Sequence, residues 1–118
     1  MRLCVEVAED KKGQGVEVLD VRKTLGIADY FLIVSGDNRR QIQAIAEEIQ
    51  VRFKRDAGFT PTAEGLDTGR WVLVDLDTVV VHVFDRPTRE LYGLEHLWAD
   101  APRVDRSKLG LALQAGQG

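Results

Sequence analysis

Two apolar segments on either side of Asp77-Thr78 constrain the fold of this chain more than any other feature of its sequence. Side chains alternate between the two faces of a strand, so a two-residue turn here assigns every neighbouring side chain to one face of a β-hairpin. One face is then entirely aliphatic and is predicted to lie against a core: Val72, Val74, Leu76, Val79, Val81 and Val83. The opposite face mixes apolar, aromatic and polar groups: Trp71, Leu73, Asp75, Val80, His82 and Phe84. Burial in a simple core does not explain the composition of this second face.

Two interpretations of the mixed face are open at this point. In the first, the face lies partly under a helix, with Asp75 and His82 solvated at its margin, as is common on antiparallel sheets. In the second, the face binds a partner protein. A Trp on a half-exposed sheet, surrounded by polar groups, has the composition of an interface hot spot.

Helical patterns and further strands complete the domain. Apolar residues at helical spacing predict a short N-terminal helix and a longer helix with an apolar stripe from Ile42 to Phe53. Asn38 suits the N-cap of the longer helix, and Gln41 completes a capping-box pattern. Pro87 suits the first turn of a final helix.

The predicted order is helix, strand, strand, helix, strand, hairpin, helix. Residues 16–21 and 30–34 supply the first two strands, and the continuously apolar second one is predicted to be covered on both sides. This order predicts a single α/β domain with a mixed β-sheet flanked by helices over residues 1–102. Residues 103–118 are polar and contain glycine, and we expect them to form a flexible C-terminal tail.

Composition excludes several classes of function. No apolar run approaches the roughly 20 residues of a membrane helix, and acidic residues interrupt the N-terminal apolar stretch, unlike in a secretory signal. We therefore expect a cytoplasmic protein with no membrane partner. Cys4 is the only cysteine, so an intrachain disulfide or a cysteine-based zinc site is excluded. The net charge of −3 argues against charge-driven nucleic-acid binding and suits a basic protein partner.

Two patterns resemble parts of a nucleotidyl-transfer site. Ser35-Gly36 lies at a strand end before a helix N-terminus, a place suited to phosphate. Asp75 and Asp77 are two residues apart and could share a divalent ion. Both patterns also have structural explanations, because any helix needs a cap and Asp is common in turns. Neither histidine has a partner at metal-ligand spacing, and there is no P-loop. We predict no catalytic residue, metal or cofactor; a small metal-dependent nucleotidyltransferase is the alternative.

The motifs of this chain resemble those of a known family. In order they are DYFLIVSGDNRRQIQAIAEEI, EG, GRWVLVDL, VVVHVF and TRELYGLEHLWADA. From about Val5 to Ala101 the chain resembles the ribosomal silencing factor family, also called Iojap-like. The resemblance implies a fold related to nucleotidyltransferases but without their catalytic set, and a homodimer when free. It also implies binding to the large ribosomal subunit through ribosomal protein L-fourteen, which sterically blocks association with the small subunit and represses translation. An assembly factor for the large subunit is a further alternative within the same family.

The resemblance also suggests which residues contact the partner. Trp71 and Asp75 match the family's W-x-x-x-D strand, and His82 matches its V-H-V strand. The segment R-x-x-Y-x-L-E-x-L-W adds further expected partner contacts, namely Arg89, Tyr92 and Glu95. The family usually has Gly-Asp at the hairpin turn where this chain has Asp77-Thr78. Thr does not tolerate the positive φ of tight hairpin turns, so the pairing register is open at this stage.

Overall fold

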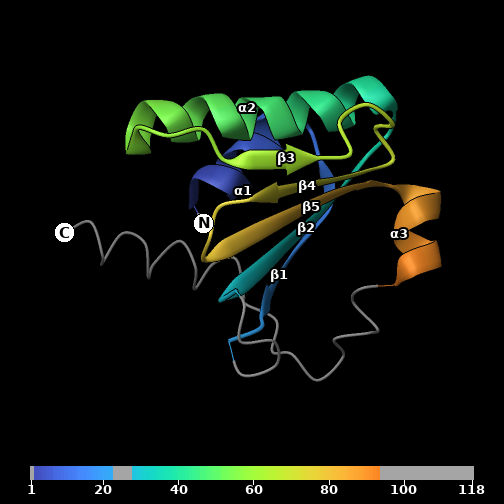
Figure 1. Cartoon of the computed structure of the whole chain (residues 1–118). Coiled ribbons are helices and arrows are strands. Elements are labelled where there is room, and N and C mark those ends of the chain that lie inside the picture. The colour runs from blue at the N-terminus through green and yellow to red at the C-terminus, as the bar shows by residue number, and fades with distance from the viewer. Residues whose placement is uncertain (1, 23–27, 94–118) are drawn as a thin grey trace.

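The computed structural model describes residues 2–22 and 28–93, which form a five-stranded sheet with helices packed against it (Figure 1). The elements follow the predicted order: α1 (Arg2–Asp10), β1 (Gln14–Asp20), β2 (Tyr30–Gly36), α2 (Arg39–Ala57), β3 (Thr62–Glu64), β4 (Trp71–Asp75), β5 (Val79–Asp85) and α3 (Arg86–Tyr92). The strands lie side by side in the order β1-β2-β5-β4-β3. The β2–β5 pair is parallel and the other pairs are antiparallel, which confirms the predicted mixed α/β sheet. No helix of the described residues is long and apolar enough to cross a membrane.

The hairpin register is confirmed. Val72 pairs with Val83, and the Leu76 N–H donates to the Val79 carbonyl at 2.9 Å, which leaves Asp77-Thr78 as a two-residue turn. Asp77, rather than Thr78, takes the positive φ, at 74°. Asp tolerates this conformation better than a β-branched residue does, and the Asp75 carboxylate stabilises the turn by accepting from the Asp77 N–H at 2.8 Å. The chain thus makes a tight turn without a glycine.

The aliphatic face of the hairpin lies in the main core, as predicted. It packs with buried residues of α1 and α2, and both helices cover this same face of the sheet (Figure 1). The apolar stripe of α2 supplies four fully buried residues: Ile42, Ile45, Ala46 and Ile49. Burial of each of the three Ile side chains stabilises the fold by about 1.5–3 kcal/mol.

A second, smaller core covers the opposite face of the sheet. Phe84 is fully buried there beside residues of β1, β2 and the segment that joins them: Leu19, Val21, Ala28, Phe31 and Ile33. His82 belongs to this layer and is only 5 % exposed, with the Phe31 ring packed edge-on at 4.7 Å. The interpretation that placed a solvated His82 at the margin of this face is therefore wrong. The continuously apolar β2 supplies residues to both cores, which confirms that it is covered on both sides.

The ends of α2 and α3 follow local sequence signals. The Asn38 side chain caps α2 by accepting from the Gln41 N–H at 2.8 Å. The second half of the predicted capping box differs, because the side-chain Oε1 of Gln41 accepts from the backbone N–H of Asp37 rather than from that of Asn38. The amide of Gln41 also donates to the carbonyls of Lys11 and Lys12, both at 2.9 Å, and so ties α2 to the turn after α1.

Gly93 ends α3 in the left-handed conformation, with φ 54°. Pro87 lies in the first turn of that helix, as predicted. The rest of the last family motif, from residue 94 on, and the expected tail over 103–118 lie outside the described residues.

Replacing a valine of the main core with a carboxylate is predicted to unfold the domain. Val81 is fully buried, so Val81→Asp places an unpaired charge where water cannot reach it. The cost of several kcal/mol is comparable with the roughly 5–15 kcal/mol that stabilises a small domain. Thermal melts followed by circular dichroism are expected to lose their cooperative transition. Val51→Asp, on the exposed face of α2, is the control and is expected to keep the cooperative transition. A melt like that of the wild type for Val81→Asp would contradict the assignment of Val81 to the core.

Burial of His82 predicts that acid destabilises the fold. Burial lowers the pKa of His82 from its ordinary value of 6.5 to about 4, so the folded protein keeps this ring neutral while the unfolded chain takes up a proton. The neutral buried ring therefore stabilises the fold fully above the pKa of His82 in the unfolded chain. That stability is lost as the pH falls from about 6.5 towards the folded-state pKa of about 4.

The free energy of unfolding is predicted to fall by about 2 kcal/mol between about pH 7.5 and about pH 5 because of His82. Urea titrations of the wild type and of His82→Gln at both pH values measure it. The variant keeps a hydrogen-bond acceptor but has no imidazole to titrate, so its loss of stability is expected to be smaller by that amount. Equal losses in the two proteins would mean that His82 titrates alike in the folded and unfolded states.

Candidate protein-binding surface

Trp71 is the centre of a group of aromatic rings at the start of β4. Its half-buried ring stacks on Phe84 with centroids 4.9 Å apart and an interplanar angle of 28°. Tyr92 of α3 packs against the same indole at 4.6 Å. Trp71 therefore joins the second core to the exposed side of α3, and these contacts restrict how the ring can turn.

A hydrogen bond from the indole to His82 fixes Trp71 further. The Trp71 Nε1–H donates to His82 Nδ1 at 3.1 Å. Because Nδ1 accepts, the neutral imidazole carries its proton on Nε2, and that atom is buried without a hydrogen-bond partner among the residues that the structure describes. Since its one polar atom is already paired inside the protein, Trp71 presents only apolar ring surface to the outside.

A surface hollow of about 680 Å³ lies beside this ring. It is bounded by the loop before β4 and by α3: Thr68, Arg70, Trp71, Thr88, Leu91 and Tyr92. The Leu91 side chain is 80 % exposed and that of Tyr92 is 53 % exposed, so two large apolar groups face solvent next to Trp71. We call the set Trp71, Leu91 and Tyr92 the aromatic surface. Leu91 and Arg70 were not among the predicted contacts; Leu91 lies about one helical turn after Thr88, which lines the same hollow.

Polar side chains of α2 hold the loop that precedes Trp71. Arg39 donates to the Asp67 carbonyl and Gln43 donates to the Leu66 carbonyl. At Gly65, with φ 85°, a Cβ atom would overlap the Trp71 carbonyl oxygen, so the loop can pass this close to β4 only with glycine there. Gln43 is not part of the apolar stripe of α2, and its side chain helps to position the site.

Asp75 lies away from the aromatic surface. It is exposed at the far end of β4, four residues and about 13 Å along the strand from Trp71, at about 3.3 Å per residue. Its carboxylate accepts from the Asp77 backbone in the turn. Asp75 and Asp77 thus stabilise the turn locally, and no group of three His, Cys, Asp or Glu side chains in the described ranges is arranged to hold a metal ion.

Arg89 and Glu95 complete the predicted set. Arg89 reaches towards β2, where its Nη1 donates to Ser35 Oγ at 2.7 Å, and so helps to attach α3 to the sheet. Glu95 lies outside the described residues. Of the predicted contacts, the structure brings together Trp71, His82 and Tyr92, with His82 beneath the surface, and separates Asp75 and Arg89 from them.

Comparisons with known proteins agree on one family. A sequence model described as "Ribosomal silencing factor during starvation" (RsfS) matches residues 1–117. The ribosomal silencing factor RsfS of Bacillus subtilis (strain 168) is 42% identical over 105 residues, which cover 89% of this chain and 89% of that protein. A crystal structure of a protein from Chromobacterium violaceum superimposes with a TM-score of 0.79 at 37% identity, covering 83% of this chain and 82% of the other.

A more distant relative comes from Mus musculus and is named "Mitochondrial assembly of ribosomal large subunit protein 1". It is 29% identical over 100 residues, which cover 81% of this chain and 43% of that protein. The match over nearly the whole chain and the shared fold lead to one conclusion: this chain belongs to the ribosomal silencing factor family.

Proposed function

We propose that this protein represses translation in the cytoplasm by binding the large ribosomal subunit and sterically blocking its association with the small subunit. Membership of the family supports a role at the ribosome. The observation that carries the proposed mechanism is the aromatic surface, where a Trp is fixed from behind and two large apolar side chains are exposed beside it. Such a surface suits binding, and occlusion requires no bond to be made or broken.

The aromatic surface has the properties of a binding hot spot. Trp and Tyr dominate the energetics of protein interfaces because they bury large areas with few rotatable bonds. The His82 hydrogen bond and the stacking on Phe84 fix the Trp71 ring in the free protein. Binding therefore costs little side-chain entropy at this residue.

Charge supports a basic protein as the partner. The chain has a net charge of −3, and the exposed Asp75 adds a carboxylate at the hairpin end of the mixed face. We propose ribosomal protein L-fourteen as the contact on the large subunit, with Asp75 and Glu95 facing its basic groups. Complementary charge of this kind mainly accelerates association and fixes orientation.

The free protein is proposed to be a homodimer. If the dimer uses the aromatic surface, it has to dissociate before the large subunit can bind, because one surface cannot be buried against two partners at once. The balance between dimer and complex then sets how much of the protein is available to silence ribosomes.

A role in large-subunit assembly is the second candidate. The mouse relative is named for assembly of the mitochondrial large ribosomal subunit, and it is similar to most of this chain. Both functions use binding to the large subunit, and they differ in whether mature subunits are prevented from joining. The metal-dependent nucleotidyltransferase alternative depends on Asp75 and Asp77, whose observed contact is the hydrogen bond within the turn.

Removal of the Trp71 ring is predicted to weaken binding to the large subunit. The binding free energy is expected to weaken by on the order of 1–4 kcal/mol, the range for an aromatic hot spot. Co-sedimentation of Trp71→Ala with purified large subunits, over a range of protein concentrations, measures it. Thermal melts test that the variant remains folded.

Phe59→Ala is the matched control. Phe59 is also an exposed aromatic residue, at 54 %, but it follows the C-terminal end of α2, at the opposite end of the molecule from α3 (Figure 1). This variant is expected to bind like the wild type. If Trp71→Ala also binds like the wild type while folded, the aromatic surface is not the binding site.

A further inference from the structure

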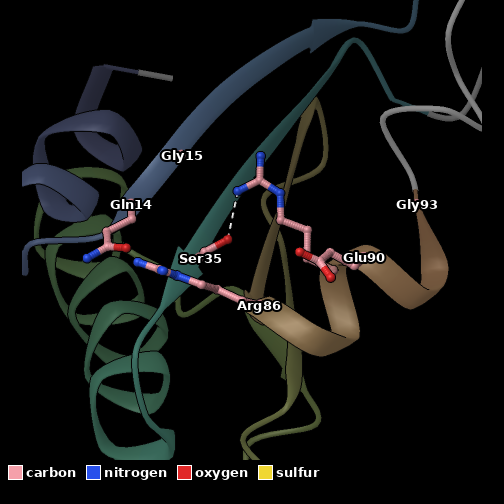
Figure 2. Close-up of a pocket in the computed structure, with 7 residues that line it drawn as sticks. Gln14, Gly15, Ser35, Arg86, Glu90 and Gly93 are labelled. Carbon is pink, nitrogen blue, oxygen red and sulfur yellow. Dashed lines mark hydrogen bonds between the residues drawn. The ribbon is translucent and has the colours of Figure 1, made fainter.

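A second cavity lies on the side of α3 that faces β2 (Figure 2). β2 and β5 are parallel, so their carboxyl ends lie together, with Ser35 paired to Phe84 and Gly36 paired to Asp85. α3 begins directly after β5 and forms one wall of the cavity. Ligands in α/β sheets commonly bind outside the carboxyl ends of parallel strands. The function proposed above makes no use of this place.

The cavity is polar and large enough for a small molecule. Its volume is about 510 Å³, within the range of small-molecule sites. Side chains and backbone from β1, β2 and α3 line it: Gln14, Gly15, Ser35, Arg86, Arg89 and Glu90. No aromatic side chain of the described residues lines the cavity, so a nucleobase would have no ring to stack on.

Two arginines of α3 line the cavity: Arg89, which reaches Ser35, and Arg86, whose side chain extends towards Gln14 (Figure 2). Arg89 is oriented by its hydrogen bond to Ser35 Oγ at 2.7 Å. The Arg86 side chain is 61 % exposed, and its contact with Asp37 is long, at 3.4 Å. An exposed ion pair of this kind contributes little energy, so Arg86 can turn towards a ligand at small cost. Paired guanidinium groups bind phosphate oxygens with strong, directional hydrogen bonds.

Carboxylates also border the cavity and limit what it can bind. Glu90 lines it directly, and Asp37 accepts from the Gln14 amide at 3.3 Å as well as from Arg86. A ligand made only of phosphate offers the Glu90 carboxylate no hydrogen-bond donor. A ligand that also carries hydroxyl groups can donate to this carboxylate.

Gly15 keeps the space beside Arg89 open. Its φ is +58°, and a Cβ atom there would lie 2.7 Å from Arg89 Nη1. Any other residue would push the guanidinium away from Ser35 and would be strained in this conformation. The position of Arg89 at the cavity wall thus depends on a backbone that approaches it closely.

We propose that this cavity binds a small phosphorylated sugar, with the phosphate between Arg86 and Arg89 and the sugar hydroxyls towards Glu90. The site is separate from the aromatic surface, and its occupation does not depend on the function proposed above. A negative result in the test of one proposal therefore does not contradict the other.

Titration of the full chain with ribose 5-phosphate, followed by amide chemical shifts, tests the proposal. Saturable shifts are expected for Gly15, Ser35 and residues of α3, with much weaker binding of ribose and of inorganic phosphate. Arg86→Gln is expected to reduce the affinity about tenfold, the effect of losing a charged hydrogen bond. Arg86 is exposed, so this variant is expected to fold normally.

Arg55→Gln makes the same change of charge at the far end of α2, where the side chain is 69 % exposed. This control is expected to bind ribose 5-phosphate like the wild type. Three results would overturn the proposal: no saturable shifts at millimolar ribose 5-phosphate, unchanged affinity in Arg86→Gln, or inorganic phosphate that binds as well as the sugar phosphate. Loss of affinity in Arg55→Gln would also overturn it, because binding would then follow net charge rather than the cavity.

Discussion

The register of the β4–β5 hairpin is the constraint on which the rest of this structure depends. With Val72 opposite Val83, the entirely aliphatic face of the hairpin lies against α1 and α2, while Trp71, His82 and Phe84 share the other face. A slip of one residue would exchange the two faces and place His82 in the main core. The parallel pairing of β5 with β2 extends the register across the sheet and brings Ser35 beside Phe84, next to the start of α3. Both the aromatic surface and the second cavity therefore follow from a two-residue turn at Asp77-Thr78.

Much of this fold was predictable from the sequence because its signals are local. Alternation along the strands identified both faces of the hairpin, and the apolar stripe from Ile42 to Phe53 identified the helix that covers one of them. The Asn38 cap marked the start of that helix. The positive φ of Asp77 could also have been predicted from the sequence, since Asp tolerates this conformation better than Thr does.

The parts of the site that were missed depend on tertiary arrangement. Alternation places Trp71, Asp75 and His82 on one face, but it does not show how far along that face they lie or what covers them. His82 is buried because β5 is the middle strand of the sheet and side chains of the second core, such as Phe31, pack beside it, and Asp75 is exposed because it lies at the hairpin end. Arg89 and Tyr92 are neighbours on α3, yet one contacts Ser35 and the other Trp71. Which side of a short helix each residue takes depends on how the helix packs, and the sequence alone does not determine that.

α3 thus separates two surfaces of different chemistry, one apolar beside Trp71 and one charged beside Ser35. In the proposed function the apolar side binds the large ribosomal subunit, and the bulk of the domain excludes the small subunit. Sucrose-gradient sedimentation of purified subunits, with this protein added before magnesium-driven joining, tests that proposal most directly. We expect the protein to migrate with the large subunit and the joined-ribosome peak to be lost. A protein that stays at the top of the gradient, with joining unchanged, would contradict silencing by occlusion.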